Sequence, residues 1–181
     1  MLLPIVMYGH PILRKKAQRI EAIDDSILQL IADMKETLLS KNGLGLAAPQ
    51  VGKSVQLFMT NVPENEDEFR MRIDNVRVFI NPKILSYSNE GWIHDEGCLS
   101  LPQIYIPIPR PLSVVVQFQD ETGKAFEETL SEWPARVFCH ENDHINGVLT
   151  PDRADSRERK RIEPILKHIK EQFKQHNEQF N

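Results

Sequence analysis

The chain has 181 residues, of which 40% are hydrophobic, and a formal net charge of −4. The length and composition predict a single domain over residues 1–181 with a substantial core, and the negative charge argues against general nucleic-acid or specific DNA binding. No apolar run approaches the ~18 residues of a membrane span, and residues 1–6 are too short and interrupted for a secretory signal, so a cytoplasmic protein is expected.

The first predicted helix follows polar residues at 24–26 that suit a helix N-terminus. Apolar residues then recur at helical spacing over 27–38. Asn42 and Gly43 form a pair typical of helix ends, so we expect this helix to end there.

Residues 43–50 read Gly-Leu-Gly-Leu-Ala-Ala-Pro-Gln. The segment superficially matches a dinucleotide-binding fingerprint, but that fingerprint requires a strand before it and a helix after it. Here a helical pattern precedes the segment, and Pro49 would lie inside the required helix, so we reject nucleotide binding. Gly43 and Gly45 instead allow backbone to pass close to a ligand, and Gln50 offers an amide donor.

The middle of the chain predicts β-structure. Strands are expected at 55–59, 76–80, 104–108 and 114–119, and a turn at 120–123 closes a hairpin back into 125–130. The charged segment 61–75 is expected to be a mobile loop with no assigned chemistry.

Residues 139–144 read Cys-His-Glu-Asn-Asp-His, which contains His-Glu-x-x-His. A helix is expected from about 134 to 147, and residues four apart lie on the same face of a helix. His140 and His144 can therefore bind one metal ion, with Glu141 beside it to take a proton from a metal-bound water. The alternative is a helix with two unrelated histidines and a solvated glutamate.

A catalytic metal of this kind usually has three protein ligands. One protease subclass takes the third from a downstream histidine, but Thr150 stands at that position here. Glu158 and Glu163 are conceivable, although they lie among many similar charged residues. Cys98, in Glu-Gly-Cys-Leu-Ser at 96–100, is the stronger candidate.

The other cysteine, Cys139, directly precedes His140 and points about 100° away from the ligand face of the helix. We expect it to be a small buried apolar residue. A disulfide between Cys98 and Cys139 is the alternative for both, but so low a cysteine count without a secretion signal argues against it.

A third helix is expected over 157–173 or beyond, within a C-terminal extension at about 154–181. One face is apolar: Ile162, Ile165, Leu166, Ile169 and Phe173. The other face mixes lysine and arginine with glutamate, as a solvated face does. All assigned site residues precede Thr150, so we expect the extension to be dispensable for chemistry on short peptides.

Three of these segments, in this order, resemble the signature motifs of peptide deformylase: residues 43–50, residues 96–100 and His-Glu-Asn-Asp-His at 140–144. The resemblance extends to Pro-Ile-Leu-Arg at 11–14 and Gly-Val-Leu at 147–149, and it covers essentially 4–153. Two positions depart from the family. Cys139 stands where the family usually has glutamine, beside a ligand, and Ile145 stands where it usually has leucine.

The resemblance implies an α+β fold, with antiparallel sheets packed around a central helix carrying His-Glu-x-x-His and helices toward both termini. It also implies a metal-dependent hydrolase that removes the formyl group from the N-terminal formylmethionine of newly synthesised proteins and releases formate. The implied metal ligands are Cys98, His140 and His144. Glu141 would accept the water proton and pass it to the departing amine, while Gln50 and the Leu99 N–H would hold the oxyanion together with the metal.

The resemblance also implies a substrate site formed by Gly43, Leu44, Gly45, His94, Gly97, Tyr105 and Val137. Leu44, Tyr105, Val137 and the stem of His94 would surround the methionine side chain. Glu96 would pair with Arg110 behind the site. Ordinary core packing or a surface ion pair is the alternative for each of these residues.

A thiolate with two imidazoles suits zinc, iron or cobalt. The resemblance favours Fe²⁺, for which Zn²⁺, Ni²⁺ or Co²⁺ can substitute, and it implies that the C-terminal helix docks on the ribosome. Two rival functions stay open. A zinc endopeptidase shares the helix motif but takes its third ligand downstream, and an inactive ribosome-associated relative is kept open by Cys139.

Overall fold

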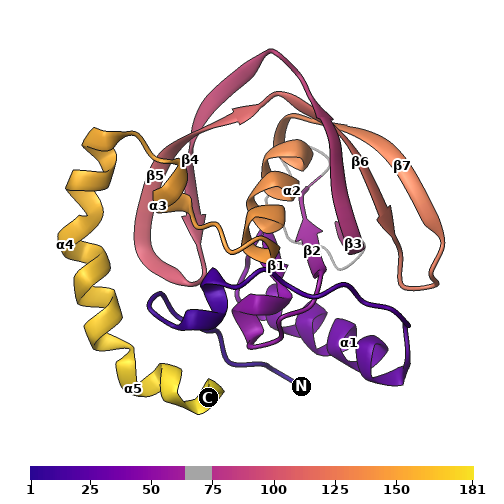
Figure 1. The fold of residues 1–181 in the computed structure, drawn as a ribbon, viewed down its shortest axis with the longest axis horizontal. Coiled ribbons are helices and arrows are strands. Elements are labelled where there is room, and N and C mark those ends of the chain that lie inside the picture. The colour runs from indigo at the N-terminus through magenta and orange to yellow at the C-terminus, as the bar shows by residue number, and fades with distance from the viewer. Residues whose placement is uncertain (64–74) are drawn as a thin grey trace.

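Two antiparallel sheets lie on different sides of one central helix, α2 (Figure 1). The computed structural model describes residues 1–63 and 75–181. The larger sheet has the order β1-β2-β3-β6-β7 and the smaller pairs β4 with β5. The strands are β1 Gly45–Ala47, β2 Leu57–Asn61, β3 Val76–Tyr87, β4 Gly91–Cys98, β5 Leu101–Pro111, β6 Ser113–Gln119 and β7 Ala125–Ser131.

The helical elements connect and cover these sheets. The α-helices are α1 Asp25–Ser40, α2 Glu132–Ile145, α3 Thr150–Arg153, α4 Ser156–Gln172 and α5 Lys174–Asn177, and the 3₁₀ turns are η1 Pro11–Arg14, η2 Ala48–Val51 and η4 Glu178–Phe180. The fold is therefore α+β, as predicted. None of the helices in the described ranges is long and apolar enough to cross a membrane.

Helix α1 begins and ends as its sequence predicts. The Asp24 side chain accepts a hydrogen bond from the Ile27 N–H at 3.0 Å, which satisfies one of the free N–H groups at the helix start. At the other end Asn42 takes a φ of 51°, and the Gly43 N–H bonds back to the Leu38 carbonyl. The chain thus leaves α1 directly into β1.

Helix α2 is central because its apolar side packs on the larger sheet. Phe138 meets Phe58 and Phe79 edge to face, with ring centroids 5.0 and 5.1 Å apart. Helix α2 starts at Glu132, slightly before the predicted position, and carries His140 and His144 along its buried length. The His-Glu-x-x-His segment is thereby fixed between the two sheets.

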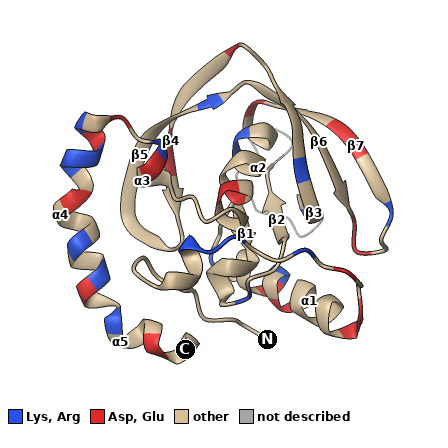
Figure 2. Ribbon diagram, in the orientation of Figure 1, with Lys and Arg blue, Asp and Glu red and all other residues tan. Residues whose placement is uncertain are grey.

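Helix α4 packs its apolar stripe on β5. Ile162, Leu166 and Ile169 share one buried cluster with Leu101 and other residues of β5. Ile165, expected in the same stripe, is 38% exposed and lies outside this cluster. The outer face of α4 carries lysine, arginine and acidic residues along its length, as Figure 2 shows.

The sequence patterns did not predict β1 or β4, and β3 and β5 extend beyond their predicted ranges. In β5, Pro107, Pro109 and Pro111 lie at alternate positions opposite β4. Proline is tolerated in a two-stranded ribbon because the N–H groups of one edge face no partner strand.

Most of the expected mobile loop at 61–75 lies outside the described residues.

Candidate active site

Three potential metal ligands converge between β4 and α2. Cys98 ends β4, and His140 and His144 lie one turn apart on α2. Their donor atoms all lie within 4.8 Å of one another, and Cys98 Sγ is 3.3 Å from His144 Nε2. A soft thiolate with two imidazoles in this space is a donor set that fits a divalent transition metal.

Gly97 allows the hairpin to bring Cys98 to this point. The register of β4 and β5 shifts between Glu96 and Cys98, as it does at a β-bulge. A Cβ atom at Gly97 would lie 2.8 Å from Cε1 of Tyr105, so the ring of Tyr105 requires a residue without a side chain there. Glycine is therefore needed for the local packing.

His140 is oriented by Glu96. Its Nδ1 lies 2.9 Å from Glu96 Oε1. Burial raises the pKa of Glu96, but hydrogen bonds with Arg110 and His140 lower it by more, to far below its usual range. The carboxylate is ionised and can only accept hydrogen bonds, so Nδ1 carries a proton and Nε2 faces the cluster.

The two histidines have opposite shifts in pKa. Burial lowers the pKa of His140, but hydrogen bonds with Cys98 and Glu96 raise it by more, to well above its ordinary value. A bound cation at Nε2 would replace that proton. Burial and then the neighbouring His140 lower the pKa of His144, which leaves this imidazole neutral. A neutral imidazole is the form that binds a metal.

The Glu141 carboxylate lies beside the ligands and faces Gly45. A Cβ atom on Gly45 would lie only 2.3 Å from Oε1 of Glu141, so the glycine makes room for the carboxylate. Burial raises the pKa of Glu141 to about 7. Its Oε2 is buried with no hydrogen-bond partner among the described residues. Glu141 can therefore exchange a proton near neutral pH.

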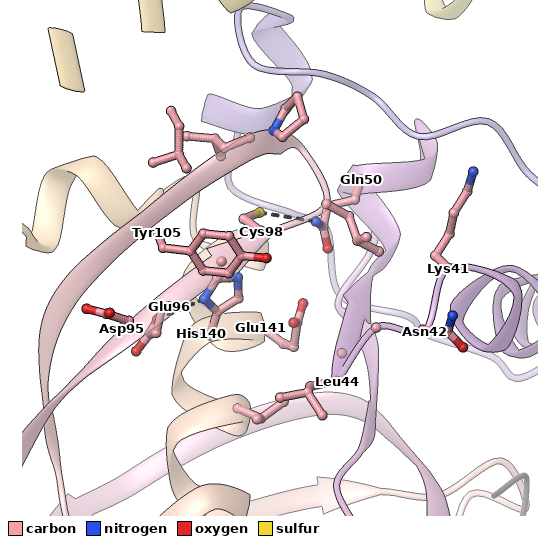
Figure 3. Close-up of a pocket in the computed structure, with 18 of the residues that line it drawn as sticks. Lys41, Asn42, Leu44, Gln50, Asp95, Glu96, Cys98, Tyr105, His140 and Glu141 are labelled. Atoms are coloured by element: carbon pink, nitrogen blue, oxygen red, sulfur yellow. Dashed lines mark hydrogen bonds and ion pairs between the residues drawn. The ribbon is translucent and has the colours of Figure 1, made fainter. Parts of the chain in front are cut away.

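Gln50 lies beside Cys98, and a dashed line joins its amide to the sulfur (Figure 3). Its Oε1 accepts the Ala47 N–H at 2.9 Å, which fixes the orientation of the amide. Its Nε2 then lies 3.3 Å from Ser100 Oγ and 3.6 Å from Cys98 Sγ. The amide donor is thus held at the edge of the metal cluster, and Leu99 lies in the turn between β4 and β5.

A cavity of about 480 Å³ opens next to these groups. The expected substrate-site residues that line it are Gly43, Leu44, Gly45, Gly97, Tyr105 and Val137. His94 does not line it. The His94 ring instead packs edge-on against Trp133, with centroids 4.6 Å apart, and Trp133 does line the cavity.

The expected pair of Glu96 and Arg110 is buried and bidentate, with both N–O distances 2.9 Å. Sequence reasoning missed the charges around it. Arg136, 1% exposed, donates to Glu96 Oε2 at 2.6 Å, and Asp143 accepts from Arg110 at 2.7 Å. Arg153 also donates to Asp143, at 2.8 Å. The only available signal was that Arg136 and Asp143 share a helix with the two histidines.

Cys139 is separate from the metal cluster. It packs among apolar residues including Phe138, and burial raises the pKa of its thiol to about 11. Both cysteines are free, so the disulfide alternative is wrong. Of the other ligand candidates, Glu158 pairs with Arg161 on α4, at 2.7 Å. Among the described residues, Cys98 is the one that groups with His140 and His144 as a third potential metal ligand.

Comparison with known proteins gives consistent matches. The family model for polypeptide deformylase matches residues 2–160. The peptide deformylase of Christiangramia forsetii is 38% identical over 176 residues, which cover 93% of this chain and 90% of that protein. The crystal structure of peptide deformylase from Thermotoga maritima has a TM-score of 0.78 at 38% identity and covers 86% of this chain and 99% of its own. A plant peptide deformylase structure has a TM-score of 0.86 at 38% identity and covers 96% of this chain and 92% of its own.

Proposed function

The chain belongs to the polypeptide deformylase family, and from this premise we propose how its residues perform the reaction. The protein is a metal-dependent hydrolase that removes the N-formyl group from formylmethionyl nascent peptides. The observation that carries the proposal is the buried Glu141 carboxylate beside the group formed by Cys98, His140 and His144.

We propose Fe²⁺ as the resident ion, held by Cys98 Sγ and by Nε2 of His140 and His144. The orientation of His140 by Glu96 supports this ligand set, as does the neutral state of His144. The ligand types also fit Zn²⁺, Ni²⁺ or Co²⁺, and the family resemblance favours iron. When bound, the ion supplies a Lewis acid that makes water acidic near neutral pH and polarises a carbonyl oxygen.

Glu141 is proposed as the proton carrier. Its buried carboxylate has a pKa of about 7, and a group with such a pKa can both accept and donate a proton at neutral pH. Glu141 would take the proton of the attacking water and deliver it to the departing amine nitrogen. The space that Gly45 leaves lets the carboxylate lie close to both positions.

Gln50 Nε2 and the Leu99 N–H are proposed as the donors to the developing oxyanion. The Gln50 amide is 1% exposed and is oriented by the Ala47 N–H, so it needs little rearrangement during the reaction. Preorganised donors of this kind stabilise charge that exists only in the transition state. Their effect is therefore expected on turnover more than on substrate affinity.

The cavity beside the ligands is proposed to bind the methionine side chain. Leu44, Tyr105 and Val137 line it with mainly apolar surface, and so does Trp133, whose ring packs on His94. An unbranched methionine side chain suits such an apolar space because it is flexible and polarizable. Gly43 and Gly97 would allow the peptide backbone to approach closely.

We also propose that the enzyme meets its substrates in the cytoplasm as they leave the ribosome. The charged outer face of α4, in the extension at about 154–181, would provide the ribosome contact (Figure 2). Its mixture of basic and acidic residues along α4 is compatible with a polar docking surface and equally with a solvated face. Ribosome pelleting with and without substitutions on this face would test the proposal.

The deciding experiment is purification without oxygen, followed by metal analysis and by measurement of formate release from a formyl-Met peptide. Stoichiometric iron and rapid formate release are expected. The same preparation should leave internal peptide bonds intact, which separates the proposed chemistry from that of a zinc endopeptidase. A fully metal-loaded protein that releases no formate would support the inactive-relative alternative.

A further inference from the structure

The C-terminal segment returns to the N-terminal segment and binds its backbone. In Figure 1 both ends of the chain lie in the lower part of the molecule, below β1 and β2. Asn177, at the end of α5, is 6% exposed. Its Oδ1 accepts the Met7 N–H at 2.9 Å, and its Nδ2 donates to the Met7 carbonyl at 3.0 Å. One side chain therefore satisfies both backbone groups of Met7.

The residues on either side of Met7 bind the loops that carry the oxyanion donors. The Val6 N–H donates to the Gln50 carbonyl at 2.8 Å, and the Tyr8 N–H donates to the Ser100 carbonyl at 2.9 Å. Ser100 follows Leu99, and its hydroxyl also receives the Gln50 amide at 3.3 Å. Residues 6–8 therefore hold Gln50 and Ser100 in a fixed relative position, and Asn177 fixes the residue between the two contacts.

Neighbouring contacts support the same arrangement. A Cβ atom on Gly52, the left-handed residue that ends η2, would lie 2.8 Å from the Phe180 ring. Nε2 of His176 lies 2.7 Å from the Ile5 carbonyl. The segment 174–180 thus contacts both the end of the turn that carries Gln50 and the backbone of Ile5, next to residues 6–8.

We propose that Asn177 is a positioning residue for deformylation, acting through Met7 on the relative placement of Gln50 and the Leu99–Ser100 turn. The proposal rests on the proposed role of Gln50 as an oxyanion donor. It replaces the expectation that the C-terminal extension is dispensable for chemistry on short peptides. Asn177 touches no reacting atom, so its effect must pass through the backbone of residues 6–8.

The physical reason is that an oxyanion donor acts only at short range. Displacement of a catalytic group by about 1 Å can cost up to ~10²-fold in rate, even when the displacement originates far from the reacting atoms. Loss of the Asn177 amide leaves the buried Met7 N–H without a partner, and it leaves the Met7 carbonyl with only the longer bond from the His10 N–H at 3.3 Å. Residues 5–8 are then free to shift, and the Gln50 and Ser100 carbonyls shift with them.

The test compares Asn177→Ala with Gln175→Ala, a matched change at an exposed position of the same short helix. For Asn177→Ala we expect kcat on a formyl-Met tripeptide to fall about tenfold, with KM within about twofold and metal content unchanged. Amide hydrogen exchange at Val6 and Tyr8 should accelerate. Gln175→Ala should match the wild type in every measurement.

A double-mutant cycle with Gln50→Ala identifies the route of the effect. If Asn177 acts through Gln50, then Asn177→Ala should change kcat by less than about twofold when the Gln50 amide is already absent. Equal effects in both backgrounds, or an unchanged kcat in folded Asn177→Ala, would overturn the proposal. A Gln50→Ala enzyme with normal kcat would instead overturn the donor role of Gln50 itself.

Asn177→Asp separates the two hydrogen bonds that the Asn177 side chain makes with Met7. This change keeps the acceptor for the Met7 N–H and the size of the side chain, but removes the donor to the Met7 carbonyl. We expect a kcat between those of the wild type and Asn177→Ala, with the same insensitivity in the Gln50→Ala background. A kcat equal to that of the wild type, with faster exchange at Val6 and Tyr8, would show that the contact does not position the donors.

Discussion

Oε1 of Glu96 lies 2.9 Å from Nδ1 of His140, and the same carboxylate receives two hydrogen bonds from Arg110. The ring of a candidate metal ligand is therefore connected directly to a buried ion-pair network. Arg136 adds a second guanidinium to Glu96, and both arginine side chains are almost fully buried. This connection predicts that one substitution will affect metal affinity and fold stability together.

Glu96→Gln should weaken metal binding and destabilise the protein. A lost partner of a ligating histidine typically costs about 10–100-fold in metal affinity. Removing one member of a buried ion pair typically costs about 3–5 kcal/mol of stability, because the remaining charges stay buried. Metal titration and denaturant unfolding would measure the two effects. The matched control is Glu128→Gln in the exposed pair with Arg77, where about 0–1 kcal/mol is expected. Equal effects of the two substitutions would contradict the prediction.

Cys98→Ala should abolish stoichiometric metal binding, whereas Cys139→Ala should retain it. Only Cys98 brings its sulfur close to the histidine nitrogens, while Cys139 packs in the apolar cluster. Metal content per chain after anaerobic purification measures the outcome. Full occupancy in Cys98→Ala would exclude Cys98 as a ligand.

Gln50→Ala should lower turnover more than substrate affinity. The Gln50 amide is held in place by the Ala47 N–H before any substrate binds, so it is suited to the transition state. An oxyanion donor is typically worth ~3 kcal/mol, or about a hundredfold in kcat. Steady-state kinetics on a formyl-Met peptide separate the two effects. Unchanged kcat with a raised KM would assign Gln50 to ground-state binding.

Glu141→Gln should keep the metal but lose most of the activity. The substitution preserves shape and polarity while it removes the group that exchanges a proton. Loss of a general base typically costs about 10²–10⁴-fold, and more if the same group protonates the amine. The measurement is the deformylation rate per bound metal ion. A near-normal rate in fully loaded protein would refute the mechanism, and loss of the metal would make Glu141 a ligand.

Gly45→Ala should lower kcat substantially and the melting temperature only slightly. The added methyl group would lie 2.3 Å from Oε1 of Glu141, so the carboxylate must move from its position. Gly123→Ala is the contrasting control, because Gly123 has a φ of 83° and meets only Ile23 Cδ1 at 3.8 Å. That control should lower the melting temperature through backbone strain and leave kcat unchanged. The prediction fails if Gly45→Ala retains the kcat of the wild type.

The sequence predicted those elements whose own residues determine their structure. Helix α1 combines a capping aspartate with an apolar stripe, and the hairpin of β6 and β7 has alternating residues and a turn with Gly123. Strand β4 was missed because most of its residues are exposed and its apolar residues do not alternate with polar ones, and it is a strand only through pairing with β5. Strand β1 was missed because three residues give no periodicity.

The arrangement of the candidate site was predictable where its residues follow a local motif. His140, Glu141 and His144 follow from spacing on one helix, and the cavity contains most of the residues that the resemblance implied. Arg136 and Asn177 were not predictable, because a charged or amide residue on a helix is usually solvated. Their partners lie in distant segments, Glu96 for the first and Met7 for the second.

Cys98 belongs to a two-stranded ribbon, and His140 and His144 belong to the helix against which that ribbon packs. An ion bound to all three is therefore a cross-link between two layers that share no backbone ladder. Because the unfolded chain does not bring these ligands together, ion binding and folding are linked by mass action. Each tenfold rise in free ion above its dissociation constant would add about 1.4 kcal/mol to the free energy of unfolding. The melting temperature of this enzyme is thus expected to depend on the ion concentration at which it is measured.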